Sequence, residues 1–181
     1  MWLAAGLMLG IGLGFGFIWM RNRAITLRPD EVLSGKEVKN SPEIGSAAPD
    51  FELQTLDGEK MNLSSLLGHT VLINFWATWC GPCRTEMPAI ESRFEAYQDQ
   101  MTILAVNFDE PEDDVQSFAK ELNLTFPILL DPGAKVQDLY RVRGYPTTFL
   151  VDSQGIIQVM HIGVMSEKQL DGYLKQIGVA K

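Results

Sequence analysis

Cysteine and histidine are scarce in this chain: its 181 residues include only two of each. Structural zinc usually takes four Cys or His ligands, and neither His69 nor His161 stands at a metal-ligand spacing from the cysteines. We therefore expect no metal site. Basic residues are also too few to balance the acidic ones, 15 against 23, and the net charge of −8 argues against nucleic acid as a partner.

The two cysteines stand two residues apart, as Cys80 and Cys83, with Gly81 and Pro82 between them. An apolar run that predicts a buried strand precedes them, and a helical pattern follows. A helix N-terminus lowers the pKa of a thiol, because unpaired N–H groups favour negative charge. We expect Cys80 to be exposed and to attack, and the more covered Cys83 to resolve the mixed disulfide. The predicted redox group is this Cys80–Cys83 disulfide itself, with no other cofactor.

The cysteine pair has two other interpretations. The pair resembles half of a zinc site, but the remaining ligands are missing. A purely structural disulfide would close too small a loop to stabilise the fold much through chain entropy. The sequence favours a redox-active pair over both.

The N-terminal segment contains no charge from residue 2 to residue 20. At about 1.5 Å per residue such a helix spans about 28 Å, close to a bilayer core of about 30 Å. Trp2 and Trp19 stand at its two ends, as in an aromatic belt. We predict an uncleaved transmembrane anchor over residues 1–20. Three arginines follow the anchor, and this charge alone would keep the rest of the chain in the cytoplasm. The thiol chemistry instead favours an extracytoplasmic location. We expect the extracytoplasmic location.

Beyond the anchor we predict a solvated tether over residues 21–48 and one domain over residues 49–181. An N-terminal hairpin turns at Asp57 and Gly58. Strands and helices then alternate, which predicts an α/β fold with a central mixed sheet flanked by helices. The expected strands are 71–76, 102–107, 128–130, 147–151 and 156–161, and the expected helices are 84–98, 109–122 and 166–177. Ser166 and Gln169 stand at capping-box spacing at the start of the last helix.

The acidic run at residues 109–114 invites comparison with a metal site. A helix N-terminus explains it better, because carboxylates there stabilise the helix dipole and proline is tolerated in the first turn. We interpret this run as the start of a helix.

Four motifs together point to a known family: residues 48–51 (Ala-Pro-Asp-Phe), 74–83 (Asn-Phe-Trp-Ala-Thr-Trp-Cys-Gly-Pro-Cys), 84–88 (Arg-Thr-Glu-Met-Pro) and 145–152 (Tyr-Pro-Thr-Thr-Phe-Leu-Val-Asp). In this order they resemble the membrane-anchored, extracytoplasmic thiol–disulfide oxidoreductases of the TlpA/ResA/CcmG type, which are AhpC/TSA-redoxin-like. The resemblance covers about residues 45–178 and implies a thioredoxin-like fold.

The resemblance implies roles for residues around the dithiol. Pro146 would be the cis-proline that faces it, leaving the backbone of Tyr145 free to pair with an extended client segment. Trp79 and Pro82 would shape the surroundings of the reactive sulfur. An ordinary trans peptide before a strand is the alternative for Pro146.

Glu86 matches the family's glutamate three residues after the second cysteine. A carboxylate there can take the proton of Cys83; the alternative is an exposed first-turn glutamate that stabilises the helix dipole. Glu110 aligns only loosely with a second family glutamate. Cytoplasmic thioredoxins carry a buried aspartate where this chain has Asn74, which cannot ionise.

The resulting hypothesis is a membrane-tethered oxidoreductase that reduces the disulfides of client proteins. The resemblance implies apocytochrome c as a client and a membrane-embedded thiol electron donor. A thiol peroxidase of the same fold and a non-catalytic tethered binding domain are the alternatives.

Overall fold

The computed structural model describes residues 42–180 of the chain. The predicted anchor, residues 1–20, lies outside this part, as does the tether up to residue 41. Over the described range, no helix is both long enough and apolar enough to cross a membrane.

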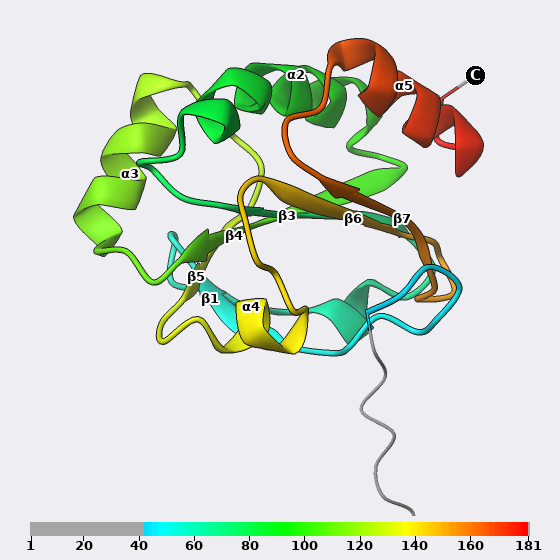
Figure 1. Cartoon of the computed structure of the whole chain (residues 1–181), viewed down its shortest axis with the longest axis horizontal. Helices are drawn as coiled ribbons and strands as arrows, with labels where there is room; N and C mark the ends of the chain where they lie inside the picture. The colour runs from blue at the N-terminus through cyan, green and yellow to red at the C-terminus, as the bar shows by residue number, and fades with distance from the viewer. Residues whose placement is uncertain (1–41, 181) are drawn as a thin grey trace, which may run out of the picture. The chain divides into compact units, whose positions relative to one another are not determined.

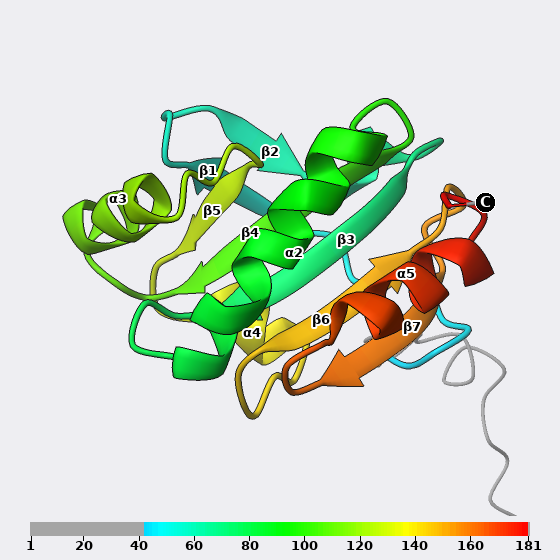
Figure 2. The same ribbon diagram turned by 90° about the horizontal axis from the view of Figure 1, so that it is seen from above.

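One seven-stranded sheet forms the centre of the described part, in the order β2-β1-β5-β4-β3-β6-β7 (Figure 2). Neighbouring strands among β3, β4 and β5 run parallel, and the other pairs are antiparallel. Helices α2, α3 and α5 cover one face, while α4 lies on the other (Figure 1). The predicted mixed sheet flanked by helices is thus confirmed.

The strands are β1 (Glu52–Thr55), β2 (Lys60–Asn62), β3 (Thr70–Trp76), β4 (Met101–Phe108), β5 (Ile128–Asp131), β6 (Thr147–Val151) and β7 (Ile157–Ile162). The helices are η1 (Leu63–Leu66), α2 (Gly81–Tyr97), α3 (Glu112–Glu121), α4 (Lys135–Leu139) and α5 (Glu167–Gln176).

The predicted N-terminal hairpin is confirmed by the antiparallel pairing of β1 with β2, in which Gln54 lies opposite Lys60. Gly58 in the turn has a φ of +83°, in the left-handed region that glycine adopts without a steric penalty.

Strand β3 lies in the middle of the sheet, and all seven of its residues are buried. Its side chains alternate between two hydrophobic cores: Leu72 and Trp76 join the core on the α2 side, whereas Ile73 and Phe75 join the core on the α4 side. A strand covered on both faces is a continuous apolar run. Asn74 interrupts this run on the α2 side, so a polar side chain lies beneath that helix.

The packed domain begins a few residues before the boundary that we place at Pro49. Gly45 donates a backbone hydrogen bond to Ile157, Ala48 donates one to Gly155, and Ala47 bridges Ile156. The end of the predicted tether is therefore paired with the start of β7.

The helices differ from the expectations mainly at their N-termini. Helix α2 begins at Gly81, three residues early, and continues through Pro88. Helix α3 begins at Glu112 after Pro111 as its N-cap, so the acidic run does start a helix, with the proline just outside the first turn. The capping box predicted at Ser166 and Gln169 is present in α5.

Candidate active site

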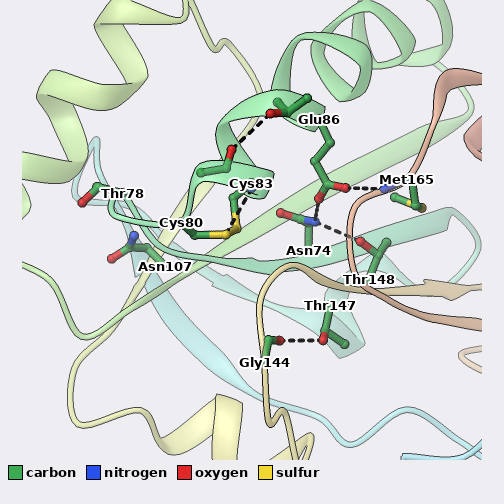
Figure 3. The surroundings of a disulfide bond; sticks show 12 residues. Asn74, Thr78, Cys80, Cys83, Glu86, Asn107, Gly144, Thr147, Thr148 and Met165 are labelled. Carbon is green, nitrogen blue, oxygen red and sulfur yellow. Dashed lines mark hydrogen bonds between the residues drawn. A yellow bond between two sulfur atoms is a disulfide. The ribbon is translucent and has the colours of Figure 1, made fainter.

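The two cysteines form a disulfide at the N-terminus of α2, with their Cα atoms 5.2 Å apart (Figure 3). Cys80 is the N-cap residue, and its Sγ accepts a hydrogen bond from the Cys83 backbone N–H at 3.1 Å. Pro82 stands within the first helical turn, where its missing N–H breaks no intrahelical bond. A thiolate formed at Cys80 would keep this N–H donor and the positive end of the helix dipole beside it.

Our expectation of an exposed Cys80 is wrong for the oxidised protein. Only 5% of Cys80 is exposed, and Cys83 is completely buried. The bond to Cys83 turns the Cys80 sulfur into the first turn of α2, where it joins the hydrophobic core on that side of the sheet. The neighbouring Trp79 is instead exposed, at 65%.

Glu86 lies one turn further along α2, and only 2% of it is exposed. Its Oε1 accepts a hydrogen bond from Asn74 Nδ2 at 2.8 Å, and its Oε2 accepts one from the Met165 backbone N–H at 2.9 Å (Figure 3). Burial raises the pKa of this carboxyl to about 6, although both hydrogen bonds act in the opposite direction. The alternative of an exposed first-turn glutamate is therefore wrong.

Asn74 and Thr148 complete this buried polar group from the sheet. They lie opposite each other on β3 and β6, and Asn74 Nδ2 also donates to Thr148 Oγ1 at 2.9 Å. Residues opposite each other in a sheet point to the same face, so both reach the underside of α2. The sequence shows the departure at Asn74 but carries no signal for Thr148, which is 74 residues away.

Glu110 binds Thr78, in the loop that leads into the disulfide. Its carboxylate accepts hydrogen bonds from the Thr78 backbone N–H at 2.7 Å, from the Thr78 hydroxyl at 2.5 Å and from Asn107 Nδ2 at 2.7 Å. In the sequence, Glu110 belongs to an acidic run that predicts a helix start, and only the loose family alignment points to a place in the site.

Trp79, the exposed residue directly before Cys80, packs against Tyr145. The ring of Tyr145 meets that of Trp79 edge-on, with centroids 5.5 Å apart, and its hydroxyl bonds to Gln137 of α4. The Tyr145–Pro146 peptide bond is cis, as the resemblance implies. Within residues 42–180, neither the amide nor the carbonyl of Tyr145 has a backbone hydrogen-bond partner.

The model of the AhpC/TSA family matches residues 44–160, which include the cysteine pair, Glu86 and the cis-proline. The chain belongs to this family. The similar proteins and solved structures are named as thioredoxin-like proteins, thiol–disulfide oxidoreductases or thiol:disulfide interchange proteins. It is 48% identical to the thioredoxin-like protein YneN of Bacillus subtilis over 130 residues, covering 70% of this chain and 76% of that one. It is 39% identical to the thiol–disulfide oxidoreductase ResA of Bacillus cereus over 140 residues, 77% of this chain and 81% of that one.

A solved structure from Chlorobium tepidum, of a candidate thiol:disulfide interchange protein DsbE, superposes with a TM-score of 0.70 at 32% identity. The match covers 75% of this chain and 97% of that one. These similarities confirm the thioredoxin-like fold, and the family member described here is a thioredoxin-like thiol–disulfide oxidoreductase.

Among the side chains of residues 42–180, no group of three or more His, Cys, Asp and Glu is arranged to hold a metal ion. In the acidic run, Asp109 accepts a hydrogen bond from the Gly133 N–H, and Glu110 is occupied as described above.

The raised pKa of Glu86 predicts a pH-dependent stability. The carboxyl titrates at its usual 4.5 in the unfolded chain and at about 6 in the folded one, a difference equivalent to about 2 kcal/mol. Because the folded state holds the proton more tightly, this contribution is fully present below pH 4.5 and is lost as the pH rises through 6. Relative to Glu86→Gln, the wild-type free energy of unfolding should fall by about 2 kcal/mol between pH 4 and pH 7.5.

Urea unfolding of both oxidised full-length proteins at these two pH values measures the difference. A difference between the two proteins that stays constant with pH would contradict the assigned pKa.

Proposed function

We propose that this oxidoreductase reduces disulfides of client proteins outside the cytoplasmic membrane, with Cys80 as the attacking and Cys83 as the resolving cysteine. The observation that carries the proposal is the buried Glu86 carboxylate, which lies one helical turn after Cys83 and has a pKa near neutrality. Such a group can accept a proton at neutral pH.

The reaction begins from the reduced dithiol. The Cys80 thiolate attacks one sulfur of the client disulfide, the client S–S bond breaks, and the client's other sulfur leaves as a thiolate that takes up a proton. Cys83 then gives its proton to Glu86 and attacks Cys80 Sγ. This forms the Cys80–Cys83 bond and releases the client's second sulfur. Two electrons have moved from the dithiol to the client, and a thiol donor must reduce the enzyme again.

The surface beside the disulfide suits an extended, partly apolar client segment. Trp79 and Pro82 are exposed, as are Ile162 at the end of β7 and Val164 just after that strand. The carbonyl of Pro146 accepts a hydrogen bond from the Gly163 N–H at 2.8 Å, which ties this last segment to the cis-proline. The unpaired backbone of Tyr145 would supply main-chain hydrogen bonds, and the apolar side chains would supply contact area.

Location and clients rest on the sequence and the family resemblance. The uncharged run at residues 2–20 supports a membrane anchor, and the resemblance supports an outward-facing domain, a membrane-embedded thiol donor and apocytochrome c among the clients. In intact cells, a membrane-impermeant alkylating reagent should label reduced Cys80 if the domain faces outward. Labelling only after lysis would overturn this location.

The two alternatives have less support. A thiol peroxidase needs a peroxide-binding pattern around its cysteine, and the residue three before Cys80 is Ala77 rather than threonine. A non-catalytic binding domain would not need a buried carboxyl of raised pKa next to the dithiol.

Cys83→Ser should trap the client. The variant keeps the attacking cysteine but cannot resolve, so one mixed disulfide per chain should accumulate with a disulfide-bonded model peptide. Intact-mass measurement of the full-length variant, with the wild type as the control that releases the peptide, checks this. Release from Cys83→Ser at the wild-type rate would contradict the assignment of Cys83 as resolver.

A further inference from the structure

Asn74 is a fully buried amide with one satisfied end and one unsatisfied end. Its Nδ2 donates to both Glu86 Oε1 and Thr148 Oγ1, at 2.8 and 2.9 Å. Its Oδ1 is buried and has no hydrogen-bond partner among residues 42–180. Buried polar atoms without partners are rare in native proteins, and each calls for an explanation.

This orientation of the amide suits only the ionised form of Glu86. A carboxylate accepts hydrogen bonds and donates none, so the NH₂ end of Asn74 must face it. Asn74 presents its NH₂ group to Oε1, and Met165 presents its backbone N–H to Oε2, at 2.8 and 2.9 Å. Both of these partners are donors, so with Asn74 held in its present orientation neither of them accepts a hydrogen bond from a protonated Glu86.

A half-turn of the Asn74 amide removes this conflict. It exchanges Nδ2 with Oδ1, so the carbonyl oxygen accepts from the protonated Glu86, and the Thr148 hydroxyl rotates to donate to the same oxygen. The Met165 N–H still donates to the other oxygen of Glu86. Each orientation leaves one end of Asn74 unpartnered, so the turn changes which atom lacks a partner and adds no new one.

We propose that Asn74 is a positioning residue that turns its side-chain amide when Glu86 gains or loses a proton, so that the buried carboxyl stays hydrogen bonded in both states. The inference deepens the proposed role of Glu86 and rests on it. During resolution Glu86 takes the Cys83 proton and must later release it. An amide that is a partner for both forms keeps the carboxyl in place through the whole cycle.

Other titratable groups face this buried site, and the test must distinguish their titration from that of Glu86. Cys83 lies on the same helix as Glu86. From β7, His161 lies opposite Thr148, and its Nδ1 is 3.1 Å from the hydroxyl of Tyr173 on α5. The α5 carboxylates Glu167 and Asp171 are paired with Arg93 instead. His161 is therefore the group whose titration must be distinguished from that of Glu86.

Proton NMR of the oxidised, ¹³C,¹⁵N-labelled full-length chain tests the turn. At pH 8 the Asn74 side-chain N–H protons should show NOE contacts to Thr148; at pH 4.5 these contacts should be lost. The midpoint of the loss should coincide with the titration of the Glu86 side-chain carbon. The contacts should be pH-independent in Glu86→Gln and should switch as in the wild type in His161→Gln. Asn74–Thr148 contacts that persist through the Glu86 titration, or a switch that depends on His161, would overturn the proposal.

Asn74→Asp supplies a second measurement, the pH dependence of the resolution rate, which would not change if Asn74 had a merely structural role. It places a second carboxyl beside Glu86, and two close carboxyls titrate as a coupled pair, one with a strongly raised pKa. The rise of the resolution rate with pH should then move from about pH 6 to above about pH 7. An unchanged pH profile would count against contact between the two groups during catalysis. If Glu86→Gln resolves mixed disulfides at the wild-type rate, the proton-transfer role fails, while the NOE measurement still decides whether the amide turns.

Discussion

Cys80→Ser is expected to lower the rate of client disulfide reduction by about a thousandfold or more, a loss of the size seen when an enzyme's nucleophile is removed. A serine hydroxyl is not ionised at neutral pH and cannot form the mixed disulfide. The remaining thiol cannot replace it, because Cys83 is completely buried within α2 and faces away from solvent. Reduction of a disulfide-bonded model protein by the pre-reduced full-length chain measures the effect.

Cys83→Ser is the matched control for Cys80→Ser. Both variants lack the disulfide and so share any loss of stability that its absence causes. Only Cys83→Ser should still form a mixed disulfide with the substrate. A Cys80→Ser protein that keeps a tenth of the wild-type activity would refute the assignment of Cys80 as nucleophile.

Glu86→Gln is expected to slow the resolving step about a hundredfold at pH 7, at the lower end of the usual contribution of a general base. The pKa of Glu86 is about 6, so at pH 7 the carboxylate is mostly ionised and can accept the Cys83 proton. Below pH 5 it is mostly protonated and contributes nothing. The wild-type rate of resolution should therefore rise with pH through about 6, and the variant should lack this rise.

Stopped-flow measurement of mixed-disulfide decay between pH 4.5 and pH 8 checks the role of Glu86. Glutamine keeps the size of the side chain and one acceptor oxygen, so most of the packing beneath α2 is preserved. The first attack by Cys80 serves as the internal control, because Glu86 is assigned no part in it. Equal pH profiles for the two proteins in the resolving step would refute the assignment of Glu86 as proton acceptor.

Local sequence signals predicted the parts of the fold that depend on local physics. The apolar run at 71–76 became β3, the Asp57–Gly58 turn formed its hairpin, and Ser166 capped α5 as expected. Helix α4 was missed because its N-cap, Ala134, has no capping side chain. Asp131 at the end of β5 accepts from the N–H groups at its start instead, and this contact exists only once the strand is in place.

The candidate site also divides into residues that the sequence could predict and contacts between distant parts of the chain that it could not. The cysteine pair could be predicted because two thiols two residues apart at a strand-to-helix junction are informative by themselves, whereas Glu86 was predicted only from its match to the family motif. The contact between Asn74 and Thr148 joins two strands, and that between Glu110 and Thr78 joins two loops 32 residues apart. No periodicity encodes such pairs. The burial of Cys80 was missed because it follows from disulfide closure and packing, not from its position at a helix start.

The reduction potential of the Cys80–Cys83 pair in the full-length chain tests the central claim, that this enzyme is a reductant, most directly. The start of α2 favours a thiolate on Cys80 only, because Cys83 is completely buried one helical turn before the Glu86 carboxylate, where a second negative charge is disfavoured. The charge on the reduced pair is therefore confined to one sulfur, and we expect the disulfide to be favoured. Equilibration in graded dithiothreitol or glutathione buffers should give a value below about −230 mV. A value between about −120 and −180 mV would instead identify an oxidant or isomerase and contradict the account.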